Sequence, residues 1–430
     1  MLYQKILNRK YLKLDNLAYL MFLSFPICYI AGSFVLNSAV FLSIIILFKQ
    51  IENPAVFLKK KILKIFIIFS ILLLLNFLNT DYKILVLEKF TLYFRFILFI
   101  FFVGFVMSDN LNKKNITYNY FLILSLFVSI DTLTQYILGK DIFGFSRNIS
   151  YNRLSGPFGD ELIVGSFLYV MTIVTFYFQI LNNSHFKFYN YVLFPFFALV
   201  ILLTGERNAF LSYLIFFILF IFLSKNFKLQ TFITLTIILV LSYFLVKNVD
   251  FLKYKYSLVG INQNTNIKKI NNNSKIVIKG KQNKIFNQIK DSQWFSHYRG
   301  AYYIFLENKF VGSGFKSYNF ECKKFINSIK NKSIQCSTHP HNIYMQLLSD
   351  IGILGFFAFT SLISFYVYVF FKNRLFHNST CTILFCLFIS FVFPFKPHGS
   401  LFSTNFAFML WFSFGLMNYE FFKNIFFKLK

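Results

Sequence analysis

Long apolar runs alternate with short polar segments along most of the chain. Each run has roughly 17 to 25 residues, which is enough for a helix to cross the hydrocarbon core of a bilayer. The runs predict about twelve membrane-spanning helices, at residues 14–30, 33–48, 62–79, 90–108, 117–138, 161–181, 188–204, 208–224, 229–247, 341–371, 379–395 and 401–422. The expected fold is therefore an all-α polytopic membrane protein.

One large polar loop interrupts this pattern between the ninth and tenth predicted spans. The loop, residues 248–340, separates a membrane domain of residues 1–247 from a second membrane segment of residues 341–430. Its first half is rich in Asn and Lys, and we expect that half to be flexible. Its second half, from Trp294 onward, contains aromatic residues, glycines and two cysteines, so we expect it to fold against the membrane domain.

Composition supports a membrane protein and argues against a nucleic-acid-binding protein. The 430 residues are 57% hydrophobic and only 14% charged, which is unlike a soluble domain. The formal net charge of +28 comes from Lys and Arg in short loops between apolar runs. Because these charges do not gather on one soluble face, we expect no nucleic-acid partner.

The distribution of Lys and Arg predicts the orientation of the chain in the membrane. If the N-terminus is cytoplasmic, the short inside loops carry more Lys and Arg than the short outside loops. Both termini are then cytoplasmic, and the large loop lies on the outer side of the membrane. The basic start, MLYQKILNRKYLK, has no clear cleavage site after its apolar run, so we interpret it as a retained first span.

This orientation gathers ionisable residues on the outer face of the membrane. They are Arg147, Arg153, Asp160, Glu161, Glu206, Arg207, His297, Arg299, His339, His341, Lys396 and His398. An arginine at a helix start suits phosphate, because its guanidinium makes paired hydrogen bonds and the helix adds partial positive charge. Simple snorkelling of arginine at the interface is the alternative. Several arginines and histidines without a carboxylate cluster favour a diphosphate substrate held without an obligatory metal.

His341 is the candidate general base. Its unperturbed pKa near 6.5 suits proton transfer at neutral pH, although a purely structural bond to backbone is the alternative. Asn342 is expected to cap the tenth span. Gly352 and Gly355 are expected to let another helix approach closely. His339 is a second candidate base.

The five cysteines fall into two groups. Cys28, Cys381 and Cys386 lie in apolar runs, where buried inert thiols are expected. Cys322 and Cys336 both lie in the large loop and could form a disulfide in an oxidising compartment. Two independent thiols, or a zinc site completed by His339 and His341, are the alternatives.

These motifs resemble the O-antigen ligase and polymerase family, which are membrane glycosyltransferases of the bacterial cell envelope. The family's ligase signature is His, then Asn, Ser or Gln, then nine residues, then Gly-x-x-Gly, and the segment from His341 to Gly355 matches this spacing. LLTGERNAFLSYL resembles the family's Thr-Gly-x-Arg turn, and HYRGAYYIFLENKFVGSGFKSYNF resembles its large loop. RLSGPFGDELIVGSF and FPFKPHGS resemble weaker stretches, so the resemblance extends over roughly residues 130–420.

The resemblance implies transfer of a glycan from undecaprenyl diphosphate to a lipid A-core acceptor at the periplasmic face of the bacterial inner membrane. It implies that His341 deprotonates the acceptor and that Arg207 and Arg299 bind the diphosphate; we add Arg153 as a further candidate. No cofactor or metal is expected, because arginine can supply the stabilising charge. Supporting or acceptor roles are assigned to His339, Asn342, Glu206, Lys396 and His398. Expected partners are the lipid-linked glycan, a lipid A-core or glycan acceptor, and membrane lipids.

Two departures from the family pattern affect these expectations. Lys309-Phe310 replaces the turn proline expected after Asn308. Glu206 stands beside Arg207 where a small residue is common, and its carboxylate could position or partly neutralise the guanidinium.

Other function classes stay open. A polysaccharide polymerase would use the same carrier, and the signature spacing favours the ligase. The number of spans would also suit a transporter, but transporters usually carry mid-membrane carboxylates and broken helices. Here Arg95 and Asp131 are the main charges inside the runs. A structural membrane protein is the third class.

Overall fold

The computed structural model describes residues 2–51, 61–78, 80–147, 153–183, 185–256, 293–329 and 334–423. Within these ranges the regular elements are helices, and one isolated β-bridge joins Lys140 to Ser146. The part of the large loop that we expect to be flexible falls mostly at 257–292, outside the described residues.

Apolar helices make up the body of the molecule. Six of those described are long and apolar enough to cross a membrane: α2 (Ser33–Gln50), α5 (Lys83–Asp109), α6 (Lys114–Leu138), α7 (Val164–Asn183), α10 (Lys228–Asn248) and α15 (Ile343–Lys372). The remaining apolar helices are α1 (Leu2–Ile30), α4 (Lys61–Leu74), α8 (Asn190–Leu203), α9 (Arg207–Leu223), α16 (Ser379–Val392) and α17 (Thr404–Phe422). Together these helices coincide with the predicted runs. The all-helical membrane class is confirmed, whereas twelve crossings stay a prediction.

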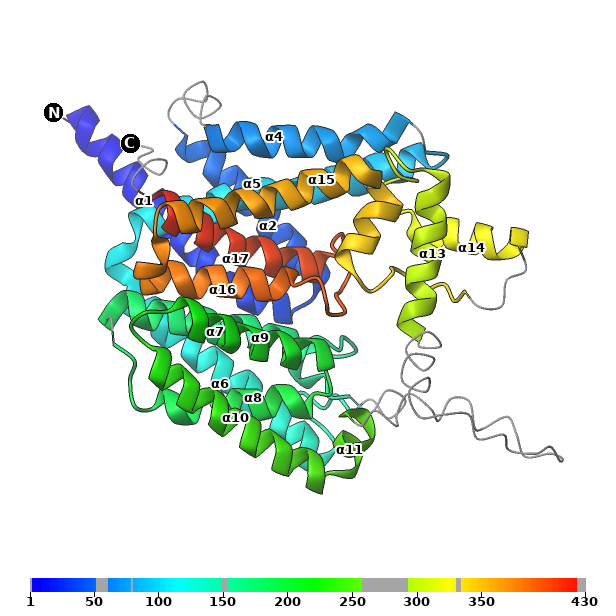
Figure 1. The fold of residues 1–430 in the computed structure, drawn as a ribbon. Helices are drawn as coiled ribbons and strands as arrows, with labels where there is room; N and C mark the ends of the chain where they lie inside the picture. Colours follow the sequence, from blue (N-terminus) through cyan, green and yellow to red (C-terminus); the bar gives the residue numbers. More distant parts are fainter. Residues whose placement is uncertain are drawn as a thin grey trace.

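The helices pack as one bundle around a shared aromatic core (Figure 1). α17 packs on α5 and α16, α6 packs on α7, and α16 also contacts α9. Phenylalanine rings fill these contacts: Phe370 stacks on Phe385 with centroids 3.9 Å apart, and Phe25 meets Phe99 edge-on at 4.8 Å. Such contacts suit helices in lipid, because there the association of helices depends largely on close van der Waals packing.

The two charges inside the apolar runs have structural partners. Arg95 donates to the Asn37 side-chain oxygen at 2.5 Å. Asp131 accepts from the backbone N–H of Ile142 at 2.9 Å. Each of these contacts joins separate segments, so neither charge needs an ion pathway to explain it.

The large loop forms a cap at one end of the bundle. It contributes α11 (Asp250–Tyr256), α13 (Gln293–Glu307) and α14 (Tyr318–Ile329). α13 and α14 lie at the end opposite to the start of α1 and the end of α17 (Figure 1). α13 packs on α14 and α15, so the second half of the loop is docked on the membrane helices.

A break in α15 fixes this docking. Gly352 has φ 69° and ψ −167°, which are not helical values, and the helix changes direction there. The loop before α14 supplies the missing backbone bonds, because Ile353 N–H donates to Lys309 O at 2.8 Å and Leu354 N–H donates to Phe310 O at 3.2 Å. In return, Gly314 N–H donates to Asp350 O at 3.0 Å. The broken part of α15 and the loop before α14 are thus joined by a short ladder of hydrogen bonds, in which each segment both donates and accepts.

Glycine is required on both sides of this ladder. A Cβ added at Gly352 would lie 2.5 Å from Gly312 N, and one added at Gly312 would lie 2.4 Å from Ile351 N. The expected close approach at Gly352 is therefore made by a loop and not by a second helix. A Cβ at Gly355 would meet only the side chain of Ile351 one turn earlier.

Candidate active site

Three histidines lie together at the junction of cap and bundle. His339 and His341 precede α15, and their ring centroids are 4.2 Å apart. His297 on α13 lies on the other side of His341, with centroids 5.3 Å apart. Among these three, His297 had no role in our sequence-based assignment; its position depends on how α13 docks.

The turn before α17 holds the histidine segment in place. His398 N–H donates to His341 O at 2.8 Å. The Asn342 side-chain amide donates to Pro394 O at 3.0 Å, while its oxygen accepts from the N–H groups of Tyr344 and Met345. Asn342 is therefore both the N-cap of α15 and a clamp on the neighbouring turn.

The ring nitrogens of His339 and His341 differ in their bonding. His339 Nε2 lies 3.3 Å from His398 O, which can only accept, so Nε2 carries the hydrogen. His339 Nδ1 lies 3.0 Å from the Thr338 hydroxyl. Among the described residues, no hydrogen bond engages the His341 ring. In this arrangement His341 has a free nitrogen for a proton, whereas His339 uses both of its own.

Both histidines are neutral at pH 7. Burial, together with His341, lowers the pKa of His339 from its ordinary 6.5 to about 3. Burial, together with His297, lowers the pKa of His341 to about 4. Desolvation disfavours the imidazolium, and close rings disfavour a second charge. Both rings are therefore unprotonated bases at neutral pH, and of the two only His341 has a ring nitrogen without a hydrogen bond to the described residues.

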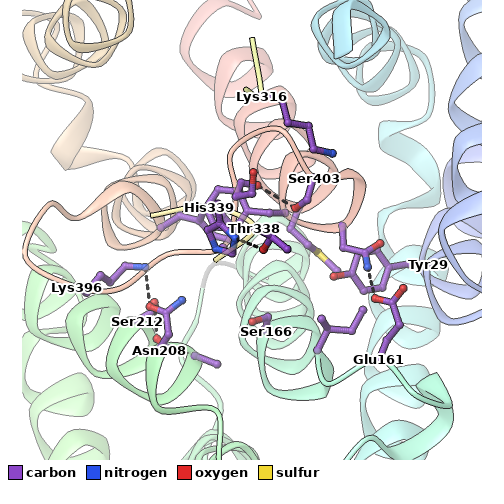
Figure 2. Close-up of a pocket in the computed structure, with 18 of the residues that line it drawn as sticks. Tyr29, Glu161, Ser166, Asn208, Ser212, Lys316, Thr338, His339, Lys396 and Ser403 are labelled. Carbon is purple, nitrogen blue, oxygen red and sulfur yellow. Dashed lines mark hydrogen bonds between the residues drawn. The ribbon is translucent and has the colours of Figure 1, made fainter. Parts of the chain in front are cut away.

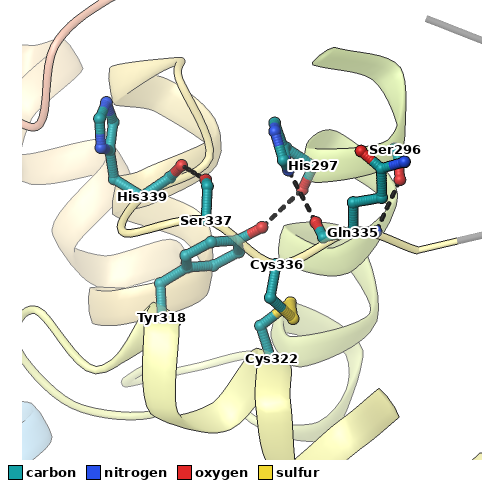
Figure 3. The surroundings of a disulfide bond; sticks show 8 residues. All are labelled: Ser296, His297, Tyr318, Cys322, Gln335, Cys336, Ser337 and His339. Carbon is teal, nitrogen blue, oxygen red and sulfur yellow. Dashed lines mark hydrogen bonds between the residues drawn. A yellow bond between two sulfur atoms is a disulfide. The ribbon is translucent and has the colours of Figure 1, made fainter. Parts of the chain in front are cut away.

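A disulfide lies next to the segment that hydrogen-bonds to His297 (Figure 3). Cys322 on α14 is bonded to Cys336, with the Cα atoms 5.7 Å apart. The next residue toward the N-terminus, Gln335, accepts from His297 Nδ1 at 2.7 Å, and Tyr318 Oη donates to His297 O at 3.1 Å. With both thiols in this bond, they are not arranged with His339 and His341 as zinc ligands.

His339 borders a cavity of about 710 Å³ (Figure 2). Its polar wall includes Lys89, Glu161, Ser166, Asn208, Lys316, Asn319, Thr338, His339, Lys396, Ser403 and Asn405. Its apolar wall includes Tyr29, Tyr169, Phe391, Phe406 and Met409. His339 lines the cavity directly, whereas His341 packs against His339. A cavity lined by both apolar and polar side chains can accommodate an amphiphilic molecule.

A group of basic residues, which we call the basic cluster, lies around the turn between α8 and α9. It consists of Arg153, Arg207 and Lys255 around Glu206. A Cβ added at Gly205 in this turn would lie 2.7 Å from Lys255 Nζ, which places the ammonium directly over the turn. Burial and the two arginines lower the pKa of Lys255 to about 8.

The direct partners of Glu206 are the start of α7 and Arg153. Its carboxylate accepts from the N–H groups of Gly165 and Ser166, at 2.8 and 3.2 Å, at the start of α7. Its ion pair is with Arg153, at 3.5 Å. Within the described ranges Glu206 makes no ion pair with Arg207. The glutamate thus positions α7 and Arg153 and leaves the Arg207 guanidinium un-neutralised by direct contact.

Arg207 links the basic cluster to the histidines. Its guanidinium lies 5.1 Å from the ring of Trp294 on α13, and it donates to Lys255 O at 3.5 Å. Trp294 and His297 are three residues apart on α13, so they lie on one side of that helix. Arg299, on the same helix, stacks on Phe295 at 5.0 Å.

Lys396 and His398 lie in the turn that clamps the histidine segment. Lys396 is 4% exposed, lines the cavity and donates to Asn208 Oδ1 at 3.1 Å in the first turn of α9. Burial lowers the pKa of Lys396 to about 7 and that of His398 well below its ordinary value. With its pKa lowered to about 7, Lys396 is only partly protonated at neutral pH.

Lys255 and Lys316 were not singled out by the sequence. Both lie in the large loop, where lysine is frequent, and no motif marks either one. Their importance follows from the docking of loop segments on the bundle, which has no local signature.

Comparison with known families identifies part of the chain. A family model described as O-Antigen ligase matches residues 191–360, a shorter stretch than that compared by motif. The matched segment includes the Arg207 turn, α13, the histidine pair and the glycines of α15. No curated protein matches the chain. Over residues 191–360 the chain is similar to the O-antigen ligase family, in agreement with the resemblance expected from its motifs.

Proposed function

We propose that the protein transfers a glycan from undecaprenyl diphosphate to a lipid A-core acceptor, at the periplasmic face of the inner membrane. The observation that carries the proposal is one cavity lined by His339 and by apolar side chains, with His341 packed against His339. The basic cluster lies next to this cavity, because Ser166 and Asn208 line it. The O-antigen ligase match supports a membrane glycosyltransferase of the ligase or polymerase type.

The donor diphosphate occupies the side of the basic cluster. The cluster borders the cavity through Ser166, which bonds to Glu206, and through Asn208, which follows Arg207. Arg207 and Lys255 bring more positive charge than Glu206 offsets, and arginine can bind two phosphate oxygens at once. Arg299 is kept as a diphosphate ligand on the motif resemblance alone, because two residues after His297 it projects from another face of α13. The prenyl chain lies against the apolar wall of the cavity.

The chemical step moves one proton and breaks one bond. The acceptor hydroxyl attacks the anomeric carbon while His341 takes its proton. The bond from that carbon to the phosphate oxygen breaks, and undecaprenyl diphosphate leaves with the electron pair. Direct displacement of this kind inverts the anomeric centre. His341 is assigned the base because its ring has a free nitrogen, while His339 forms the cavity wall.

Deletion of the gene tests the function through the envelope glycolipids. Loss of all long chains from lipid A, with polymer still attached to the carrier, supports the ligase. Glycolipids that carry a single repeat unit support a polymerase instead. An unchanged glycolipid pattern rejects both.

A further inference from the structure

A second basic site lies in the cavity, apart from the basic cluster. It consists of Lys89 on α5 and Lys316, which stands just before α14; both line the cavity. In the view of Figure 2, His339 lies between Lys316 on one side and Lys396 on the other. In this view Lys316 thus lies on the other side of His339 from Lys396.

The backbone around Lys316 is fixed by buried contacts. Lys316 has φ 62°, a left-handed value that is uncommon for a residue with a side chain. Asp350 on α15 accepts from Tyr318 N–H at 2.8 Å and from Gln346 Nε2 at 3.3 Å, which anchors the turn. The anchored turn directs the lysine side chain at the cavity (Figure 2).

The charges at this site are incompletely balanced. The Lys89 ammonium pairs with Glu88 at 2.7 Å. Within the described ranges, the Lys316 ammonium has no hydrogen bond or ion pair, and burial and Lys89 lower its pKa. Asp350 and Glu88 act on it only at longer range. A partly buried ammonium without a direct partner is costly unless an anion meets it.

We propose that Lys316, assisted by Lys89, binds an anionic substituent, phosphate or carboxylate, of the acceptor glycan. This inference rests on the proposed function, because the donor diphosphate already accounts for the basic cluster. The acceptor hydroxyl must reach the histidine pair, and Lys316 is close enough to His339 to affect its charge state. Asn319 and Thr338 line the same cavity and can form hydrogen bonds with sugar hydroxyls.

Direct binding of acceptor tests the site without requiring transfer. The probe is the lipid A-core glycolipid of a strain that lacks this gene, bound to the full chain in nanodiscs without donor. Lys316→Met is expected to weaken this binding about tenfold, because one charge-assisted contact is lost, and Lys316→Arg to preserve most of it. Lys323→Met, an exposed lysine of α14, is the matched control and should bind like the wild type.

Two further arms identify the anion and guard against misfolding. If the Lys316→Met effect disappears with acceptor dephosphorylated in aqueous hydrogen fluoride, the anion is a phosphate; if it persists, it is a carboxylate. Lys89→Met changes a different helix and should weaken binding about threefold, because Lys89 is already paired. This variant keeps the test valid if Lys316→Met does not fold.

The inference is overturned if Lys316→Met and Lys89→Met bind acceptor as tightly as Lys323→Met. It is also overturned if Lys316→Met weakens binding of undecaprenyl diphosphate and not of acceptor. Failure of the proposed function looks different: the wild type then transfers no glycan, while the dependence of glycolipid binding on Lys316 still decides the subsite.

Discussion

The rings of His339 and His341 lie 4.2 Å apart, yet only His339 lines the cavity. His339 has partners at both ring nitrogens, whereas no hydrogen bond engages the His341 ring within the described ranges. The two neighbouring rings thus differ in their hydrogen bonding, and on that difference we base the different roles that we propose for them.

Alanine variants separate these roles. His341→Ala is expected to lower kcat by about a thousandfold, the usual contribution of a general base. His339→Ala removes a wall residue but leaves the base, so kcat should fall by only about tenfold while acceptor KM rises. Both are measured with purified protein and lipid-linked donor, and an equal thermal midpoint shows that the variant is folded. The reverse order of kcat losses would make His339 the base.

The pH dependence of the reaction reports the buried environment of the base. With the pKa of His341 at about 4, it accepts protons throughout the neutral range, and kcat/KM should decline only as pH approaches 4. The lowered pKa of the histidines also makes the free energy of unfolding depend on pH. The unfolded chain titrates these histidines near 6.5, so it binds more protons than the fold between pH 6.5 and 4, and stability falls as pH drops through that window. A kcat/KM limb near 6.5 that disappears in His341→Ala would contradict the buried base.

The disulfide should matter for both stability and the histidines. Replacing Cys322 and Cys336 with serine removes the link between α14 and the segment whose Gln335 carbonyl holds His297. For a disulfide that closes a loop as short as that between Cys322 and Cys336, its removal should lower the free energy of unfolding by roughly 3 kcal/mol. We expect a lower thermal midpoint and reduced transfer, and reduction of the wild type should reproduce both effects. Cys28→Ser is the control, because Cys28 is outside this cap. Two alkylatable thiols at 322 and 336 in unreduced protein would exclude the bond.

Glu206 is predicted to act through α7 and Arg153. Glu206→Gln keeps one acceptor for the N–H groups of Gly165 and Ser166 but loses the ion pair at 3.5 Å. Because this pair is largely buried, we expect destabilisation of about 1–3 kcal/mol, seen as a lower thermal midpoint. Donor KM should change little relative to Arg207→Lys, which loses paired phosphate bonds and stacking on Trp294. A larger donor effect for Glu206→Gln would mean that the carboxylate acts on Arg207 after all.

How much the sequence predicts depends on the range of the interactions. The helices follow from apolar runs, because backbone groups in lipid must bond within their own segment. The motifs around Arg207 and His341 were found because their residues are close in sequence. The pairing of Glu206 with α7, and the cationic site at Lys316, needed the structure. These contacts join segments far apart in the chain, and a lysine in a lysine-rich loop has no pattern that distinguishes it.

The break in α15 gives a last test, because it ties the cap to the histidine helix. Gly352→Ala would force a Cβ to within 2.5 Å of Gly312 N at a left-handed backbone angle, φ 69°. The hydrogen bonds between the loop and α15 must then break, which should lower the free energy of unfolding by about 3 kcal/mol or more.

Gly144→Ala isolates the backbone contribution, since Gly144 also has a positive φ, 89°, but no atom within 4 Å of the added Cβ. The Gly144→Ala variant should lose only about 1 kcal/mol of its free energy of unfolding. We expect Gly352→Ala to lower the thermal midpoint further than Gly144→Ala and to abolish transfer, since the ladder anchors the turn that carries Lys316. Equal midpoints for the two variants would show that α15 can continue through Gly352 without the loop.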